Sequence, residues 1–168
     1  MLALYTCGST RLCVDLRPLN RRVIKQRYPF PAIEDCVSRL GNKSVFTLLD
    51  LKDSFHNIKL HPEVTKYFAF ATTDGQFEYT RRPFGFCESP AEFQKRLHIL
   101  QPFIRNNTAI VYIDDILLPS QTVSDNLQSI RLVLTELKKH NLQVNYNKCF
   151  FLRERLEYLG YMLLTVLR

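Results

Sequence analysis

Two adjacent carboxylates, Asp114 and Asp115, interrupt the apolar segment AIVYIDDILL at residues 109–118. Two like charges side by side repel, and a low-dielectric environment strengthens that repulsion. Asp-Asp is also a poor choice for a tight hairpin turn, which favours Asn-Gly or Asp-Gly. A divalent cation would remove the repulsion. The pair therefore indicates either a solvated turn or a metal site held by two rigid strands.

A third carboxylate, Asp50, ends the apolar segment VFTLLD. A neighbouring strand of one sheet would place Asp50 beside Asp114. Three carboxylates at strand ends form a hard-oxygen site suited to Mg²⁺, and two such ions assist in-line phosphoryl transfer. This chemistry fits a polymerase or a nuclease. The alternative is a solvated acidic turn to which Asp50 is unrelated.

The elements that must hold these acids are strands. Residues 44–51 read as a buried strand, and residues 109–118 read as strand, two-residue turn and strand, with the two aspartates at the tip. Two alternating segments around TTDG (72–75) predict another hairpin. The closing residues 142–164 read as extended segments with one tight turn.

Helices are expected between these strands. Ser89 is suited to cap a helix, Pro90 to occupy its first position and Glu92 to close a capping box. That helix should bend or end near Pro102. A short helix should end at Gly41. A further helix is expected to begin at Ser124 and end near Asn141, with an apolar stripe at helical spacing: Leu127, Ile130, Leu134 and Leu137. The predicted fold class is α+β, an antiparallel sheet packed on helices.

The composition is that of a globular protein with a polyanionic partner. The chain has 168 residues, 46% of them hydrophobic, and a net charge of +7, which favours nucleic acid over membrane. Five cysteines without a CxxC pair indicate reduced, mostly buried thiols. No apolar run reaches the length of a membrane span, and no signal peptide is recognisable. An intracellular, soluble protein is expected.

A set of motifs in fixed order covers nearly the whole chain, from about Gly8 to Tyr161. They read VDLRPLN, YPFP, LLDLKDSFHNIKL, FAF, RRPFGFCESPAEFQ, VYIDDILL, LKKHNLQVNYNKC and LEYLGY. This order closely resembles the reverse transcriptases of gypsy-like long-terminal-repeat retrotransposons and their retroviral relatives. Residues 112–115 match the family's Tyr-x-Asp-Asp box. That box is weak alone and strong together with the Asp50 and SPAEFQ blocks.

The resemblance implies a role for each matching residue. Asp50, Asp114 and Asp115 would be the catalytic, metal-binding triad, with Asp115 the least direct ligand and the Leu51 carbonyl an additional one. The cofactor would be two Mg²⁺ ions, with Mn²⁺ as an alternative. The implied nucleotide-binding residues are Arg11, Asp53, Ser54, Phe55, Phe84 and Lys148. The implied template and primer contacts are Pro90, Gln94, Tyr112 and Gly160.

Three of these implied roles are specific. Arg11 would contact the triphosphate with its fork of donors. Phe55 would be the aromatic steric gate that excludes a ribose 2′-hydroxyl. Lys148 would act as a general acid near the pyrophosphate. The plainer readings are a surface arginine, a packed core aromatic and a solvated loop lysine.

The sequence also departs from the family pattern. The segment LYTCGSTR lacks the lysines and the tryptophan expected around Arg11. Asp53-Ser54-Phe55 stands where Ser-Gly-Tyr is common, and Glu88 stands where Asn or Gly is usual.

The resemblance further implies one reverse transcriptase domain over residues 1–168. Partial fingers would span about 1–45 and 60–85, and the palm would form the remainder, ending near the primer grip at 159–161. The thumb, connection and RNase H portions are expected to be absent, as in a truncated copy. The whole polyprotein would also carry integrase.

The implied partners are dNTPs and an RNA or DNA template with a DNA primer, without a membrane, in the cytoplasm or in virus-like particles. Two other functions remain open from the residues. One is a catalytically inactive nucleic-acid-binding remnant. The other is a metal-dependent nuclease.

Overall fold

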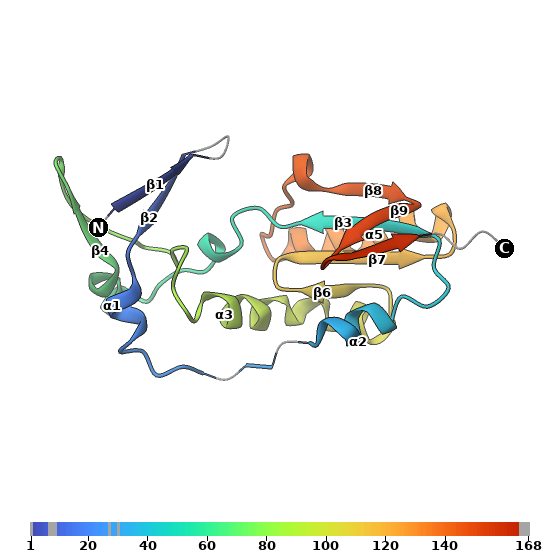
Figure 1. The fold of residues 1–168 in the computed structure, drawn as a ribbon, viewed down its shortest axis with the longest axis horizontal. Coiled ribbons are helices and arrows are strands. Elements are labelled where there is room, and N and C mark those ends of the chain that lie inside the picture. Colours follow the sequence, from blue (N-terminus) through green and yellow to red (C-terminus); the bar gives the residue numbers. More distant parts are fainter. Residues whose placement is uncertain (1, 7–9, 27, 30, 165–168) are drawn as a thin grey trace. The chain divides into compact units, whose positions relative to one another are not determined.

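The structure is a computed structural model that describes residues 2–6, 10–26, 28–29 and 31–164, with side chains from residue 13 onward. The chain divides into two compact units. Unit 1 comprises Met1–Tyr28 and Asp53–Phe93, and unit 2 comprises Pro29–Lys52 and Gln94–Arg168. Figure 1 labels most of the α-helices and strands of both units.

Unit 2 is built on a four-stranded antiparallel sheet in the order β6-β7-β3-β8 (Figure 1). Its strands are β3 (Val45–Asp50), β6 (Ile110–Tyr112), β7 (Asp115–Ser120) and β8 (Phe150–Arg153). The two central strands, β3 and β7, are mostly buried. Because strand side chains alternate between faces, both sides of this pair must be covered by other elements.

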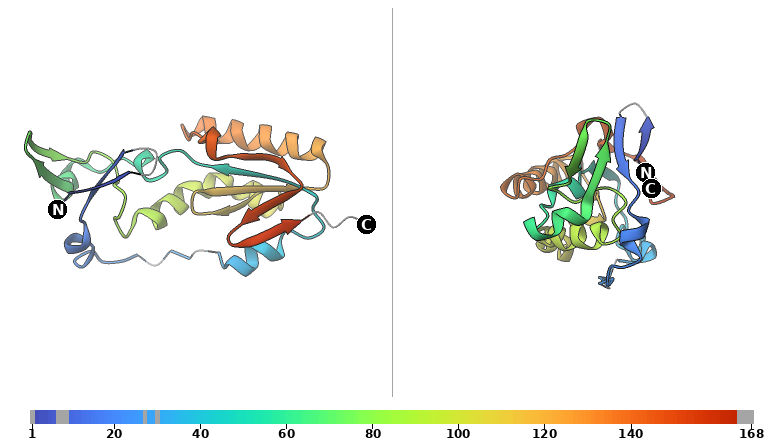
Figure 2. Two further views of the ribbon diagram at one scale, coloured as in Figure 1. Left: turned by 45° about the horizontal axis from the view of Figure 1, so that its top comes forward. Right: turned by 90° about the vertical axis from the view of Figure 1, so that its left-hand side faces the viewer.

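Helix α5 (Val123–Lys139) packs on β3 and β7. The other face carries a core cluster contributed by α2 (Ile33–Ser38), by the sheet and by the hairpin β9 (Arg155–Tyr158) and β10 (Tyr161–Leu164). Figure 2 shows α5 along one side of the sheet and α2 on the other. The members of this cluster include Phe46, Leu117, Leu156 and Tyr158. The sheet is therefore the middle layer of unit 2, in line with the α+β class expected from the sequence.

The predicted α5 boundary and stripe need correction. The helix begins at Val123, and its N-cap is Thr122, whose hydroxyl accepts from the Asp125 amide at 3.1 Å; Ser124 is therefore inside the helix. Leu127 is 51% exposed, whereas Asn126 is fully buried. The buried stripe thus starts one residue earlier than predicted, at a polar residue.

The C-terminus of α5 ends as the sequence indicated. Asn141 has φ +56°, and its amide donates to the Lys138 carbonyl at 3.1 Å. The Leu142 amide donates to the Leu137 carbonyl at 2.9 Å. These two bonds form a Schellman motif with asparagine at the left-handed position, closed by the two buried leucines.

Unit 1 contains two hairpins and short helices. The strands are β1 (Leu2–Thr6) with β2 (Thr10–Val14), and β4 (Ala69–Thr72) with β5 (Gly75–Glu78). The second pair confirms the hairpin predicted at TTDG. The short helices are α1 (Arg17–Asn20), η1 (Phe55–Asn57) and η2 (Pro62–Phe68).

A helical path follows from residue 89, through α3 (Ser89–Arg96), η3 (Leu97–Leu100) and α4 (Gln101–Arg105). Ser89 is already the first residue of α3 and is buried, and its hydroxyl donates to the Pro83 carbonyl at 3.4 Å. The expected role of Ser89 outside the helix as its cap is therefore wrong. The predicted break near Pro102 is confirmed by the change from η3 to α4. Among the described residues, no helix is long and apolar enough to cross a membrane.

Candidate metal centre and nucleotide-binding residues

The register of the central strands places two of the three acids opposite each other. β3 and β7 pair from Val45↔Ser120 to Asp50↔Asp115, so the two aspartates form the last pair. Directly opposed residues of an antiparallel pair point to the same face, with their Cβ atoms about 5 Å apart. The sheet therefore brings Asp50 and Asp115 together.

The third acid, Asp114, lies in the turn that joins β6 to β7. Tyr112 pairs with Asp115, so the two turn residues are Ile113 and Asp114. The Leu51 amide donates to the Asp114 carbonyl at 3.3 Å, which attaches this turn to the end of β3. The predicted tip formed by the two aspartates is thus off by one residue, because Asp115 already belongs to β7.

The turn carries backbone strain. Ile113 has φ +54°, a region that costs a non-glycine residue about 1–2 kcal/mol and suits a β-branched side chain least. Strain of this kind persists only where the surrounding structure enforces it, and it gathers at functional sites. Here the paired strands on both sides of the turn enforce it.

The carboxylates interact electrostatically. Burial, followed by the charges of Asp114 and Asp50, raises the pKa of Asp115 to about 6, and Lys148 partly opposes that rise. The three carboxylates are therefore close enough for their charges to interact, and together they form a region of excess negative charge. A bound cation would relieve it.

The donor set fits a hard divalent cation. Carboxylate oxygens are the ligands that Mg²⁺ takes in proteins, and the raised pKa of Asp115 indicates that Lys148 compensates its charge only in part. Within the described residues, no group of three His, Cys, Asp or Glu side chains is already closed around an ion position. The backbone therefore places the acids, and their side chains would converge on binding.

Lys148 is held near the acids by the segment that precedes it. The Asn145 amide donates to the Asp50 carbonyl at 2.8 Å, and Lys148 ends the short helix η4 (Tyr146–Lys148). The Cys149 thiol lies 3.2 Å from the Asn145 carbonyl oxygen and 3.9 Å from the Asp50 carbonyl oxygen. This anchoring keeps Lys148 close enough to Asp115 to lower the pKa of that carboxyl.

The predicted nucleotide-binding residues of unit 1 form their own group around an aromatic ring. Phe55 lies in η1, with its ring edge-on to Phe84 at 5.6 Å and to Phe93 at 6.0 Å between centroids. Ser54 is buried, and Asp53 has φ +49°. Phe55 is thus fixed by two other phenylalanines, an environment that suits both a core aromatic and a rigid gate.

The other predicted contacts are distributed over several elements. Arg11 lies in β2 opposite Tyr5, and its side chain is outside the described part of the chain. Pro90 and Gln94 lie on α3, and the Gln94 side-chain oxygen is buried without a hydrogen-bond partner among the described residues. Gly160, at φ +82°, follows Leu159, at φ +51°, in the turn between β9 and β10.

The predicted site residues fall into two sets. Unit 2 holds Asp50, Leu51, Gln94, Tyr112, Asp114, Asp115, Lys148 and Gly160, and of these the carboxylates and Lys148 lie together. Unit 1 holds Arg11, Asp53, Ser54, Phe55, Phe84 and Pro90.

One residue that supports the site was missed from the sequence. The Asn126 amide nitrogen donates to the Leu118 carbonyl at 2.8 Å, the Val45 carbonyl at 3.3 Å and the Ser120 hydroxyl at 2.7 Å. Its side-chain oxygen accepts from the Thr47 hydroxyl at 2.6 Å. Asn126 thereby connects α5 to both strands that carry the acids. Asn126 lies four residues before Ile130, so helical spacing places both on the same face, and this was the signal in the sequence that could have found it.

Solved structures share this fold. The foamy viral protease-reverse transcriptase in complex with RNA/DNA hybrid superimposes with a TM-score of 0.86 at 24% identity, over 98% of this chain and 22% of that chain. The same protein in complex with dsDNA gives 0.87 at 23% identity, over 97% and 34%. These likenesses establish a mixed α+β fold of the same kind.

The chain belongs to the reverse transcriptase (RNA-dependent DNA polymerase) family, whose model matches residues 5–163. Among curated proteins, it is 39% identical to the retrovirus-related Pol polyprotein from transposon 297 of Drosophila melanogaster, over 90% of this chain and 14% of that protein. It is 40% identical to the corresponding polyprotein from transposon opus, over 90% and 15%. It is 34% identical to the transposon Tf2-3 polyprotein of Schizosaccharomyces pombe, over 92% and 12%. The chain thus spans about one seventh of these relatives.

Proposed function

We propose that this chain is the nucleotidyl-transfer core of an RNA-directed DNA polymerase. The primer 3′-hydroxyl attacks the α-phosphate of a dNTP, a new phosphodiester bond forms, and pyrophosphate leaves. The observation that carries this proposal is the Asp50↔Asp115 pair, joined by Asp114 in the adjoining turn. Membership of the reverse transcriptase family supports it.

The acids are the proposed ligands of the metal cofactor. Asp50, Asp114 and Asp115, with the Leu51 carbonyl, would hold Mg²⁺, or Mn²⁺ in its place. Two bound ions of this type lower the charge of the reacting phosphate and favour in-line displacement. The chain holds Asp50 and Asp115 rigidly, since they belong to strands that pair along six residue pairs.

Lys148 is the proposed proton donor to the leaving pyrophosphate. Its ammonium is close enough to Asp115 to lower the pKa of that carboxyl. A cation beside the acids would also favour a polyphosphate over a neutral ligand. The hydrogen bond between Asn145 and Asp50 keeps the start of this segment in place.

Phe55 is the proposed filter for deoxynucleotides, with Asp53, Ser54 and Phe84 lining the same nucleotide and Arg11 contacting its triphosphate. A ring wedged against Phe84 and Phe93 has little freedom to move away from a ribose 2′-hydroxyl. A steric filter needs that rigidity, because a mobile ring would accommodate the extra oxygen.

The proposed domain arrangement follows the family. Fingers would comprise about 1–45 and 60–85, and the palm would comprise the remainder up to the primer grip at 159–161, with thumb, RNase H and integrase elsewhere in a Pol polyprotein. Template and primer would contact Pro90, Gln94, Tyr112 and Gly160. The related foamy viral enzyme was solved with an RNA/DNA hybrid and with dsDNA, which supports these partners. The proposed location is intracellular, in the cytoplasm or in virus-like particles.

Primer extension on an RNA template with Mg²⁺ and dNTPs tests this function. The chain should incorporate dNMP in template order, and Asp114→Asn should abolish incorporation. Asp125→Asn is the matched control, because Asp125 is an exposed acid on α5 of the same unit and should retain activity. Absence of extension at every enzyme concentration would overturn the proposal. Nucleotide-independent cleavage of single strands would instead indicate a nuclease, and salt-sensitive binding alone an inactive remnant.

A further inference from the structure

The short helix η1, which carries the proposed sugar filter Phe55, is a single 3₁₀ turn. The Ile58 amide donates to the Phe55 carbonyl at 3.0 Å and closes this turn. Hydrogen bonds of 3₁₀ helices have poorer geometry than those of α-helices, and such helices are rarely longer than one turn. The backbone of η1 therefore depends on contacts from other parts of unit 1 to keep its position.

A segment that is distant in the sequence, residues 79–84, bonds to the chain that follows η1. The Leu60 amide donates to the Thr80 carbonyl at 2.9 Å, and the Arg82 amide donates to the Ile58 carbonyl at 2.9 Å. Both stretches belong to unit 1. These two bonds fix the path of the chain just after η1, but they do not involve the carbonyls of η1 itself.

Aromatic rings hold the side chains of η1. The His56 ring is stacked on the Tyr79 ring, with 6.3 Å between centroids, and meets the Phe84 ring edge-on at 4.7 Å. Phe84 also contacts the Phe55 ring, at 5.6 Å between centroids. The position of Phe55 against Phe84 therefore depends on the backbone that joins Phe55 to His56.

The Arg81 side chain bonds directly to that backbone. Its guanidinium donates to the His56 carbonyl at 2.9 Å. Hydrogen bonds with a charged donor are about twice as strong as neutral ones. Arg81 is exposed, so its side chain does not serve to fill the core. The bonded carbonyl belongs to the residue after Phe55, so this bond limits the movement of the backbone that carries the Phe55 ring.

We propose that Arg81 is a positioning residue for the discrimination between dNTP and rNTP, and that it holds the His56 carbonyl so that Phe55 keeps its place against a ribose 2′-hydroxyl. This inference rests on the proposed function of Phe55. A steric filter discriminates only if it does not yield to the larger substrate. The contacts of the Phe55 ring with Phe84 and Phe93 resist a rotation of the ring. The Arg81 bond resists a displacement of the whole turn.

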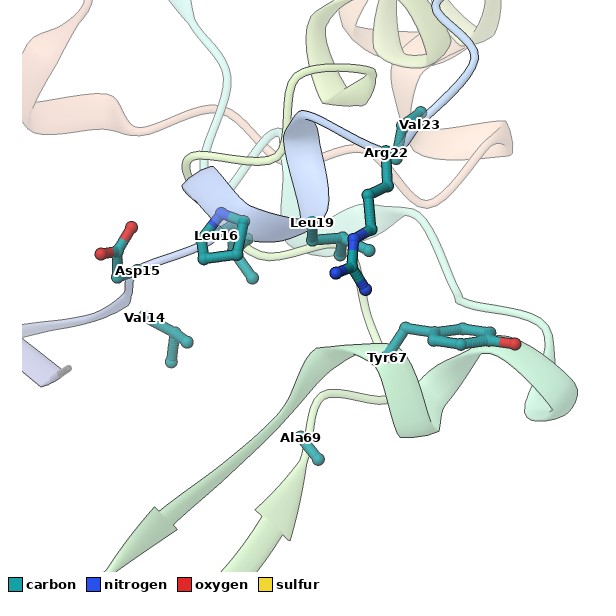
Figure 3. A pocket seen from close by; sticks show the side chains of 9 residues that line it. Val14, Asp15, Leu16, Leu19, Arg22, Val23, Tyr67 and Ala69 are labelled. Carbon is teal, nitrogen blue, oxygen red and sulfur yellow. The ribbon is translucent and has the colours of Figure 1, made fainter.

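An arginine elsewhere in unit 1 provides a matched control. Arg22 is exposed and lines a pocket of about 540 Å³ between the end of β2, α1 and the junction of η2 with β4 (Figure 3). None of the described residues that line this pocket belongs to η1 or to residues 79–84. Arg22→Met therefore removes the same kind of side chain as Arg81→Met, with the same change in charge, outside the surroundings of Phe55.

Single-nucleotide primer extension with dCTP or CTP opposite a template guanine tests the proposal, with the ratio of the two kcat/KM values as the readout. Arg81→Met should lower this ratio about fivefold, mainly by faster CTP incorporation, because the loss of one hydrogen bond changes an equilibrium by about two- to tenfold. Arg81→Lys, whose ammonium can still donate to the His56 carbonyl, should restore most of the ratio. Arg22→Met should keep the ratio of the original chain. A general loss of stability would lower both kcat/KM values and leave their ratio unchanged.

Hydrogen–deuterium exchange of the Ile58 amide measures the same contact without catalysis. This amide closes η1, so Arg81→Met should speed its exchange several-fold, whereas Arg22→Met should not. Equal exchange in these two variants would overturn the role of Arg81, and so would equal dCTP-to-CTP ratios. A chain that extends no primer would overturn the proposed function, and the exchange measurement would still decide whether Arg81 holds η1.

Discussion

Asp115 has two roles: it pairs within the central sheet, and it is a proposed ligand of the metal. It is the first residue of β7, it pairs with both Tyr112 and Asp50, and burial and two neighbouring carboxylates raise its pKa to about 6. An ionised group in that position destabilises the fold unless a cation compensates it. Such a loss of stability is typical of functional sites, where the function requires several negative charges close together.

The raised pKa predicts a pH dependence of stability. Folded chains bind this proton more tightly than unfolded chains, whose aspartates titrate near 3.8. The contribution of Asp115 to the free energy of unfolding should therefore increase as the pH falls from 7 through 6, and be lost again as it rises. Urea denaturation in EDTA at pH 7.5 and 5.0 measures this change. Asp115→Asn should be more stable than the original chain at pH 7.5, and the difference should shrink at pH 5.0. A constant difference would contradict the assignment.

The sequence singled out three acids whose charges the structure places within reach of one another, but it did not give their register. Asp50 was expected beside Asp114, and the structure pairs it with Asp115 instead. The turn occupies Ile113 and Asp114, where an isoleucine at positive φ contradicts local preference. A one-residue shift moves every side chain of a strand to the other face. The pairing of β7 with β3 determines which register forms. Local turn propensities do not contain that information, so the sequence alone could not give it.

Tyr158 offers a second test at the residue scale. It is 2% exposed in the core cluster, burial raises the pKa of its phenol, and its hydroxyl has no hydrogen-bond partner among the described residues. A buried hydroxyl without a partner costs about 1–3 kcal/mol. Tyr158→Phe should therefore raise the free energy of unfolding by about 1 kcal/mol. Thermal and urea denaturation would measure it, and a loss of stability would show that the hydroxyl has a partner in solution.

At the scale of elements, α5 and the two central strands act as one unit. Asn126 bonds to the Val45 and Leu118 carbonyls and to the Thr47 and Ser120 hydroxyls, all on β3 or β7. Through Asn126, α5 is hydrogen-bonded to both β3 and β7, toward the ends of these strands that lie away from the acids. The sequence predicted the helix itself from its periodicity. It did not reveal Asn126, because a polar residue at the start of an apolar stripe reads as a solvent-facing position.

Replacing Asn126 tests this connection. Asn126→Leu removes four buried hydrogen bonds, to the Val45 and Leu118 carbonyls and the Thr47 and Ser120 hydroxyls, and should lower the free energy of unfolding by about 3 kcal/mol. The Val45 carbonyl keeps its bond from the Ser120 hydroxyl, and the Thr47 hydroxyl keeps its bond from the Leu152 amide. Gln128→Leu is the matched control, an exposed polar residue two positions further along α5, and should change stability by less than about 0.5 kcal/mol. Equal effects of the two substitutions in urea denaturation would contradict the proposed role of Asn126.

At the scale of the whole molecule, the net charge favours the proposed polyanionic partner. The net charge is +7, and the reverse transcriptase family model matches residues 5–163. Five Lys and Arg residues and no acid lie between Asp15 and Glu34. The carboxylates of unit 2 are the local exception to this positive balance, as the proposed metal centre requires.

Affinity for a nucleic acid should therefore depend on salt. Each Lys or Arg that neutralises a phosphate of a single strand contributes about −0.7 to the slope of log affinity against log salt concentration. Anisotropy titrations between 50 and 200 mM KCl should give a slope steeper than about −2, corresponding to at least three phosphate contacts. A slope near zero would argue against nucleic acid as the partner.

The most direct test of the central claim is Mn²⁺ binding, followed by the electron paramagnetic resonance signal of the free ion. If Asp50, Asp114 and Asp115 form one metal centre, the chain should bind Mn²⁺. Asp50→Asn and Asp114→Asn should each weaken binding at least about tenfold, about 1.4 kcal/mol per ion. Asp125→Asn should bind like the original chain. Equal affinities for all four proteins would contradict a shared centre and, with it, the proposed polymerase chemistry.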